Sequence, residues 1–137
     1  MSIENAYNSW ADSYDAMLNK TRDLEEVVAK EMLAESRYSA ILELGCGTGK
    51  NTQWLLKKCI SLIAMDFSEA ILNKAKLKIT SEEVVFKRQD LTKPWKLLPD
   101  SFNLISCSLV LEHIEDLDDI FKKSAQVLKK NGLFYIS

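Results

Sequence analysis

Three glycines stand at alternate positions in ELGCGTGK, the stretch of residues 43–50. They follow a short apolar run and precede a segment with helical spacing. Glycine permits a tight turn and lets a ligand approach the backbone closely, and a helix N-terminus offers free N–H groups to an anion. Such a loop between a strand and a helix is typical of proteins that bind phosphates, dinucleotides or nucleoside cofactors.

Two acidic residues stand where the next two apolar runs end. Asp66 comes about 20 positions after Gly45, the separation typical of a carboxylate that binds ribose hydroxyls. Asp90 is suited to accept a hydrogen bond from an amino group. Each residue also has a simpler interpretation, Asp66 as a cap of the helix that follows and Asp90 as a turn residue.

His113 is the only histidine and the first candidate for a general base, with Glu112 beside it. A base is needed if the reacting group is a hydroxyl or a protonated amine, and it acts only within hydrogen-bond reach of the substrate. The alternative is a structural histidine at the start of a helix.

The spacing of the glycines separates the possible ligands. A phosphate-binding P-loop has four residues between its first glycine and a Gly-Lys pair that Ser or Thr follows. Here three residues separate Gly45 from Gly49, and Asn51 follows Lys50. The G-x-G-x-x-G loop of nicotinamide and flavin proteins fits at Gly45 and Gly47, but Lys50 takes the third glycine position. The P-loop pattern therefore fits poorly and the dinucleotide pattern only in part, so dinucleotide and nucleoside cofactors both stay open at this point.

Helices and strands alternate along the chain and must position these residues. Two helical segments come first, within residues 1–36. We then expect strands at 40–44, 61–65, 84–86, 102–107 and 133–137, and helices at 49–58, at 68–78 and from Asp116 or Asp118 to Leu128, with Asn131 and Gly132 closing the last helix. This pattern predicts an α/β fold, a doubly wound Rossmann-like, mainly parallel five-stranded sheet with helices on both faces. Ligands of such sheets bind beyond the carboxyl ends of the strands.

The composition narrows the class of protein and of partner. The 137 residues suit one domain, and 18 basic against 20 acidic residues give a net charge of -2, so we expect no nucleic-acid partner. We interpret the lysine pairs, such as Lys122 and Lys123, as solvated helix faces. The three cysteines lack CxxC spacing, which argues against a metal site and for a reducing, cytoplasmic location. The N-terminal segment has the pattern of neither a signal peptide nor a membrane span.

ELGCGTG resembles the first motif of the class I S-adenosylmethionine-dependent methyltransferases. The resemblance continues in order with AMDFSEAILNKAK (second strand and helix), FKRQDL (adenine-contacting segment), FNLISCSLVLEHIEDL (fourth strand) and VLKKNGLFYIS (fifth strand), while AYNSWADSYD is similar to the N-terminal lid helix of members that act on small molecules. Six ordered segments are far more specific than one loop. The resemblance implies methyl transfer from S-adenosyl-L-methionine to a small-molecule acceptor, with S-adenosyl-L-homocysteine as the product and no membrane involved.

The resemblance also implies roles for the residues around the glycine loop. Glu43 would brace the loop, and Gly45 and Gly47 would line the methionine part of the cofactor. Asp66 would hold both ribose hydroxyls. Gly49 would open the helix, and packing alone is the alternative for it.

Further along the chain, Asp90 would accept a hydrogen bond from the adenine amino group, with the Leu91 N–H nearby. Ser108 would touch the methionine end of the cofactor. Tyr14 would close over the site, although aromatic residues at helical spacing can equally form core. The full set of expected cofactor-binding residues is Tyr14, Glu43, Gly45, Cys46, Gly47, Thr48, Asp66, Phe67, Asp90, Leu91 and Ser108, with His113 as the expected catalytic residue.

Two departures from the family pattern bear on function. Asn103 stands where the family usually has Asp, and we expect a structural effect there. The sequence stops at Ser137, where family members usually continue into two more strands. We interpret residues 1–137 as one methyltransferase domain, a fragment or a short version, with lid helices at 1–36 and a cofactor-binding core at 37–137. An exposed edge at Leu133–Ser137 then predicts a homodimer. A module that binds the cofactor without catalysis and a NAD-dependent oxidoreductase remain the alternatives.

Overall fold

The structure is a computed structural model, and it describes residues 27, 30, 37–107 and 115–136. The expected lid helices with Tyr14, and the candidates Ser108, Glu112 and His113, lie outside the described residues. The elements in order are β1 (Tyr38–Leu44), α3 (Lys50–Leu55), the short 3-10 helix η1 (Leu56–Lys58), β2 (Cys59–Asp66), α4 (Glu69–Lys78), β3 (Val84–Arg88), β4 (Phe102–Cys107), α5 (Leu117–Val127) and β5 (Leu128–Ile136).

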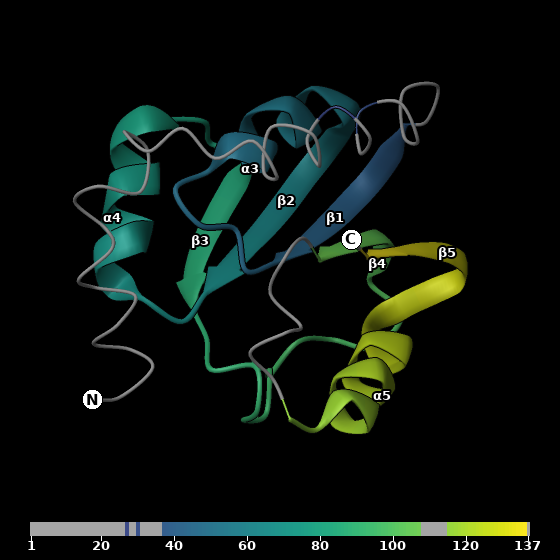
Figure 1. The fold of residues 1–137 in the computed structure, drawn as a ribbon. Helices are drawn as coiled ribbons and strands as arrows, with labels where there is room; N and C mark the ends of the chain where they lie inside the picture. The colour runs from purple at the N-terminus through teal and green to yellow at the C-terminus, as the bar shows by residue number, and fades with distance from the viewer. Residues whose placement is uncertain (1–26, 28–29, 31–36, 108–114, 137) are drawn as a thin grey trace.

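The five strands form one parallel sheet in the order β3-β2-β1-β4-β5 (Figure 1). Because all neighbours are parallel, the carboxyl ends of the strands lie along one edge. The direction of winding reverses between β1 and β4, so the glycine loop leaves β1 at the switch point, where doubly wound sheets bind ligands. The predicted fold class is confirmed.

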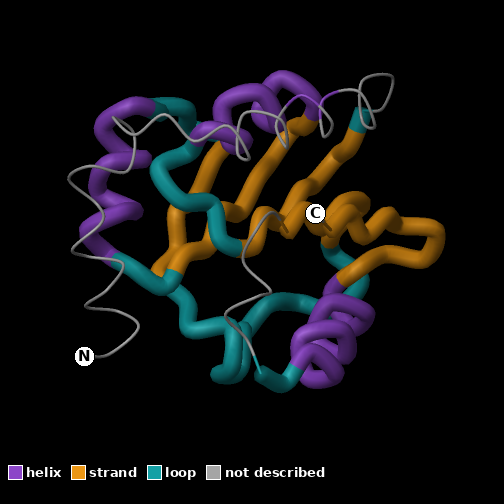
Figure 2. Tube along the Cα trace, viewed as in Figure 1, coloured by secondary structure: helices purple, strands orange, loops and turns teal. Residues whose placement is uncertain are grey.

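Successive side chains of the central strands point to opposite faces of the sheet, as they must in a pleated strand. Ile41 packs toward α3, where Trp54 and Leu55 are buried. The next residue, Leu42, packs on the opposite face, which Ile120 of α5 covers. Figure 2 shows the helices around the sheet with the strands in orange. Both faces of the sheet are therefore buried by helices, which accounts for its continuous apolar strands.

The two longer helices begin at residues whose side chains cap them. The Ser68 hydroxyl accepts the Ile71 N–H at 3.3 Å at the start of α4. The Asp116 carboxylate accepts the Asp119 N–H at 3.1 Å at the start of α5. Such caps satisfy donors that a helix N-terminus leaves open. The predicted start of α4 is confirmed, and Asp116 rather than Asp118 caps α5.

The end of α5 differs from the prediction. The helix ends at Val127 instead of Leu128, and Leu128 already pairs with Phe102 of β4. Pairing resumes at Leu104 with Leu133, so the chain between makes an excursion that Figure 2 shows at the edge of the sheet. Asn131, with φ 67°, therefore turns the excursion rather than ending the helix. The reason is that Leu128 packs beside the core and takes an extended conformation.

Asn103 has a structural role at the edge of the sheet opposite the glycine loop. Its side-chain oxygen accepts the Ala40 N–H at 2.9 Å, which ties β4 to the start of β1. An amide oxygen makes this bond without the cost of a partly buried charge.

No helix among the described residues is long and apolar enough to cross a membrane.

Candidate active site

The glycine loop turns sharply as it leaves β1 and is fixed by the end of β2. The N–H groups of Gly45 and Cys46 both donate to the Met65 carbonyl, at 2.8 and 2.9 Å. All three glycines have positive φ, from 58° at Gly47 to 93° at Gly49. A residue with a Cβ rarely adopts such angles. The alternating glycines therefore shape a compact loop directly at the switch point of the sheet.

Asp66, the last residue of β2, lies against this loop. One carboxylate oxygen accepts the Gly47 N–H at 2.9 Å, and the other accepts the Ser68 N–H at 3.0 Å. The residue is 7% exposed. A carboxylate oxygen has more than one lone pair, so both oxygens retain acceptor capacity. The Asp66 carboxylate thus brings together the glycine loop, the end of β2 and the start of α4.

Burial raises the pKa of Asp66 above its ordinary value. Hydrogen bonds from the backbone of Ser68, Gly47 and Phe67 oppose this effect without cancelling it. Desolvation penalises the charged form, whereas donors favour it. A ligand whose hydroxyls donate hydrogen bonds to Asp66 would further favour its charged form.

The segment after β3 joins the same edge. The Gln89 N–H donates to the Asp66 carbonyl at 2.9 Å, which places Asp90 beside the end of β2. One Asp90 carboxylate oxygen accepts from the N–H and the hydroxyl of Thr92, at 2.9 and 2.6 Å. Asp90 is therefore a turn residue, half-buried as a whole, at the expected place after β3. The turn and the ligand-binding interpretations are compatible.

The pKa of Asp90 is shifted in the opposite direction from that of Asp66. Partial burial acts to raise the pKa, but the hydrogen bonds from Thr92 and the positive charges of Lys93 and Lys123 outweigh it and hold the pKa below its ordinary value. The two carboxylates of this edge therefore differ in how strongly they hold a proton. Asp90 stays ionised at a pH where Asp66 begins to titrate.

Glu43 braces the loop from within the core. Its carboxylate accepts a hydrogen bond from the Thr52 hydroxyl on α3, and both residues are almost completely buried. Cys46 packs its side chain into the core beside Trp54. Burial, followed by the charges of Glu43 and Asp66, raises the pKa of the Cys46 thiol well above its ordinary value. Cys46 is therefore a neutral core residue whose side chain serves the structure of the loop.

Gly49 has a packing role. A Cβ atom on Gly49 would lie 2.6 Å from the Ile79 Cδ1 atom, closer than such atoms approach, and its φ of 93° is itself unfavourable for other residues. α3 therefore begins in contact with the end of α4. The alternative interpretation of Gly49 as a packing residue is supported directly by this contact.

Phe67 lies at the outer side of the site and is held by Arg88. The Arg88 Nε donates to the Phe67 carbonyl at 3.2 Å, and the guanidinium carbon lies 6.0 Å from the centre of the Phe67 ring. This is within the range of a cation–π contact. Arg88 thus steadies an aromatic residue next to Asp66, where a flat ring of a ligand would find a partner.

The described part of the chain thus places nine expected residues at one edge of the sheet or in the loops beside it. They are Glu43, Gly45, Cys46, Gly47, Thr48, Asp66, Phe67, Asp90 and Leu91. Their contacts with a cofactor stay predictions, as do those of Tyr14, Ser108 and His113.

Sequence reasoning missed Thr52 and Arg88, because the first is recognisable only as the partner of a buried carboxylate and the second only from its contact with Phe67. Within residues 37–107 and 115–136 no group of three or more His, Cys, Asp or Glu side chains is placed to hold a metal ion.

Comparison with known proteins gives a consistent result. Residues 42–136 match the family described as "Methyltransferase domain". A malonyl-[acyl-carrier protein] O-methyltransferase of Bacillus cytotoxicus is 31% identical, over 98% of this chain and 48% of its own length. A ubiquinone biosynthesis O-methyltransferase of Colwellia psychrerythraea is 29% identical, over 71% of this chain and 40% of its own length.

A solved structure agrees with these relatives. The crystal structure of an S-adenosylmethionine-dependent methyltransferase from Mesorhizobium loti has a TM-score of 0.68 and 30% identity, covering 74% of this chain and 46% of that one. The chain spans about half the length of the curated relatives it matches. The family match covers most of the chain, includes the glycine loop, Asp66 and Asp90, and decides against the dinucleotide and P-loop interpretations. The chain belongs to the methyltransferase-domain family, as a class I S-adenosylmethionine-dependent methyltransferase domain.

Proposed function

We propose that this chain binds S-adenosylmethionine at the carboxyl edge of its sheet and transfers the methyl group to a small-molecule acceptor. The observation that carries the proposal is the hydrogen-bonded unit in which Asp66 holds Gly47 through its carboxylate and Gln89 through its carbonyl. This unit joins the glycine loop, the end of β2 and the segment that leads to Asp90. Carboxylate oxygens accept hydrogen bonds from hydroxyl and amino groups, such as those of ribose and adenine.

The residues of this chain divide the work of binding. Asp66 accepts hydrogen bonds from the ribose hydroxyls, and Asp90 accepts one from the adenine amino group. The Leu91 N–H donates a hydrogen bond to the adenine ring. Phe67 offers its face to the base, steadied by Arg88. Gly45 and Gly47 let the methionine part approach the backbone, and Cys46 and Thr48 complete that loop. Beyond the described residues, we propose Ser108 as a further contact at the methionine end.

Methyl transfer depends more on aligning the cofactor with the acceptor than on reactive side chains. The bound cofactor supplies a methyl group activated by a sulfonium. Holding the partners in line contributes about 7–11 kcal/mol in favourable cases. We propose that Tyr14 closes over the site and excludes water. Both curated relatives named above are O-methyltransferases, so we propose an oxygen acceptor. A carboxylate acceptor needs no base, whereas a hydroxyl needs one, for which we propose His113.

We also infer the class of acceptor, the cellular location and the oligomeric state. The acceptor is a small molecule or a carrier-linked acid, the class that the names of the relatives indicate. The three free cysteines fit a reducing compartment, which supports a cytoplasmic location. The net charge of -2 supports a protein that does not bind nucleic acid. We also propose a homodimer of the chain through β5, because Leu133 and Ile136 on this outermost strand are 45% and 43% exposed.

Calorimetric titration tests cofactor binding first. The chain should bind S-adenosylhomocysteine and should not bind NAD. Binding of NAD alone would contradict the proposal. Methyl transfer is then measured from labelled S-adenosylmethionine to a panel of carboxylic acids, acyl-carrier thioesters and phenols. Cofactor binding without transfer to any acceptor of the panel would favour the alternative of a non-catalytic binding module.

A further inference from the structure

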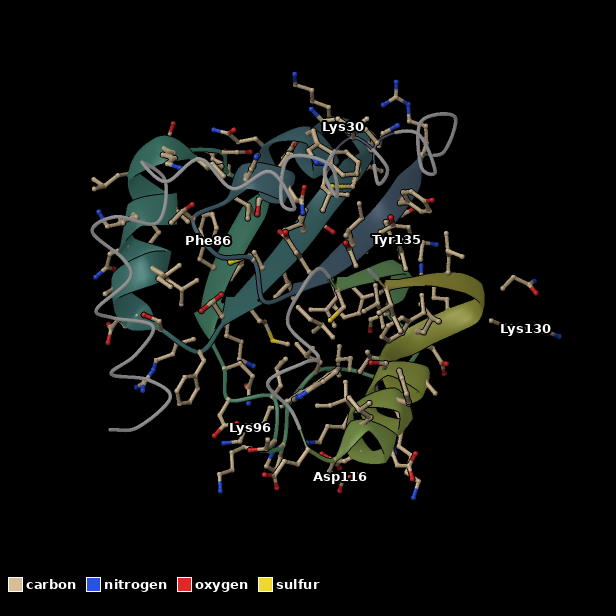
Figure 3. All side chains as sticks on the ribbon, viewed as in Figure 1. Lys30, Phe86, Lys96, Asp116, Lys130 and Tyr135 are labelled. Carbon is tan, nitrogen blue, oxygen red and sulfur yellow. The ribbon has the colours of Figure 1, made fainter. Side chains whose placement is uncertain are left out.

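Lys123 of α5 contacts the loop after β3. Its ammonium donates to the Leu91 carbonyl oxygen at 3.0 Å, although the two residues are 32 positions apart. The Lys123 side chain is only 18% exposed. Interpreting Lys122 and Lys123 as a solvated helix face is therefore wrong for Lys123, while Lys122 is exposed. In Figure 3 the labels Lys96 and Asp116 mark the same end of the molecule, where this loop and the start of α5 lie.

The Leu91 carbonyl is the centre of a small network. The Trp95 indole N–H also donates to it, at 3.0 Å, and the Lys123 ammonium lies 5.9 Å from the centre of the Trp95 ring. The Lys87 ammonium donates to the Trp95 carbonyl at 2.7 Å. Leu91 and Trp95 are both buried in the core that α5 covers. The loop after β3 is thus closed on itself at this carbonyl, which Lys123 also ties to α5.

The position of Lys123 is itself defined from the helix side. Its ammonium pairs with the Asp119 carboxylate at 2.6 Å, one turn earlier on α5. A lysine held between a carboxylate, an aromatic ring and a carbonyl has lost most of its rotamer freedom, a cost that only a defined geometry offsets. Its charge also acts on Asp90, next to Leu91. Lys123 therefore acts on both residues that would bind adenine, on Leu91 by a hydrogen bond and on Asp90 by its charge.

We propose that Lys123 is a positioning residue for adenine recognition, acting through the Leu91 carbonyl. Leu91 carries both this carbonyl and the N–H that would donate to the adenine ring, and Asp90 precedes it. The Leu91 carbonyl belongs to the same planar peptide unit as the Thr92 N–H, which donates to the Asp90 carboxylate at 2.9 Å. Holding this carbonyl from α5 therefore holds the Asp90 carboxylate in place and restricts the backbone of Leu91. Lys123 works through the loop rather than by contact with the cofactor. The inference rests on the proposed cofactor site.

The test compares two ligands that differ only at the base edge, S-adenosylhomocysteine and S-inosylhomocysteine, whose ring carries oxygen in place of the amino group. Lys123→Met keeps the aliphatic stem over Trp95 and removes the donor. We expect it to weaken S-adenosylhomocysteine binding about tenfold, roughly 1.4 kcal/mol, and S-inosylhomocysteine binding by less than about twofold. Lys123→Arg, which keeps a charged donor, should recover part of the loss.

Lys122→Met is the matched control, since it removes the same charge from the exposed side of the same helix. It should leave both affinities unchanged. Equal losses for the two ligands with Lys123→Met, or no loss, would overturn the inference. Thermal melting without ligand checks that the variant is folded, and if it is not, Lys123→Gln is compared with the same two ligands. Failure of the wild-type chain to bind S-adenosylhomocysteine would overturn the proposed function together with the role of Lys123.

Discussion

The Asp66 carboxylate accepts the Gly47 N–H at 2.9 Å, across 19 positions of the chain. Its other oxygen holds the Ser68 N–H, so one side chain sets both the shape of the glycine loop and the start of α4. The carboxylate proposed to bind ribose is therefore also a structural part of the loop proposed to bind methionine. Substitution of Asp66 should affect both parts of the cofactor site at once.

Asp66→Asn should separate binding from stability. Removing the buried charge stabilises the fold, but the new amide group faces an N–H donor, a mismatch that costs about 1–3 kcal/mol. Because these effects oppose each other, we expect little net change in the free energy of unfolding, measured in urea. Affinity for S-adenosylhomocysteine should fall more than about tenfold. Asp100→Asn, at an exposed loop residue, is the control. Unchanged affinity would remove Asp66 from the site.

Cofactor affinity should decrease in acid because of Asp66. Its pKa is raised, so lowering the pH protonates it above the ordinary value of 3.8 and turns an acceptor into a donor. The pKa of Asp90 is lowered, so Asp90 stays ionised over the same interval. Titrations of S-adenosylhomocysteine from about pH 8 down to about pH 4 should show the decrease in the wild type and a flatter profile in Asp66→Asn. The same decrease in both chains would assign it to another group.

Gly49→Ala should destabilise the fold through one defined clash. The new methyl group would meet the Ile79 Cδ1 atom, and the φ of 93° would add strain. We expect a loss of about 1–3 kcal/mol in the free energy of unfolding. Ile79→Val removes the clashing atom, so the double variant Gly49→Ala, Ile79→Val should lose less than the sum of the two single variants. Strict additivity in urea denaturation would show that backbone strain alone is responsible.

Thr52→Val should destabilise the loop brace at Glu43. The valine is nearly isosteric but cannot donate to the buried carboxylate, which loses this hydrogen bond. We expect a cost of about 1–3 kcal/mol. Thr52→Ser keeps the hydroxyl and should cost less, chiefly through the lost methyl group. If the two variants unfold at the same urea concentration, the hydrogen bond contributes nothing measurable.

Leu133→Lys should prevent self-association through β5. A lysine on an outermost strand discourages pairing with another chain, and Leu133 is 45% exposed. Sedimentation velocity should show a concentration-dependent dimer for the wild type and a monomer for the variant. Leu77→Lys changes an equally apolar residue that is 83% exposed on α4, and it should leave the dimer intact. A wild type that stays monomeric at high concentration would contradict the proposed dimer.

Local patterns predicted most of the fold. The apolar run at 102–107 and the cap at Ser68 are properties of neighbouring residues, and the structure confirms both. The end of α5 was not predictable in this way, because Leu128 pairs with Phe102 of β4. A pairing between strands distant in sequence is not visible in a local pattern. Propensity at Asn131 and Gly132 indicated a turn correctly but not which element it would interrupt.

The candidate site was predictable where one segment supplies the signal. The glycines and the spacing to Asp66 indicated the right edge of the sheet. The contact between Lys123 and Leu91 was not predictable, because it depends on which face of the sheet α5 covers. The pair Glu43 and Thr52 was missed for a similar reason, since the bond exists only once the glycine loop folds α3 back over β1.

The excursion in β5 gives this fold a place where chain length is free to vary. Leu128 and Leu133 are fixed by their partners on β4, while Lys129, Lys130 and Asn131 between them are exposed, and Figure 3 shows Lys130 pointing away from the body. Residues added or removed there would leave both pairings in place. Insertions and deletions among homologues should collect at this turn. It is also a suitable place for a fluorescent label or an epitope, far in the chain from the glycine loop.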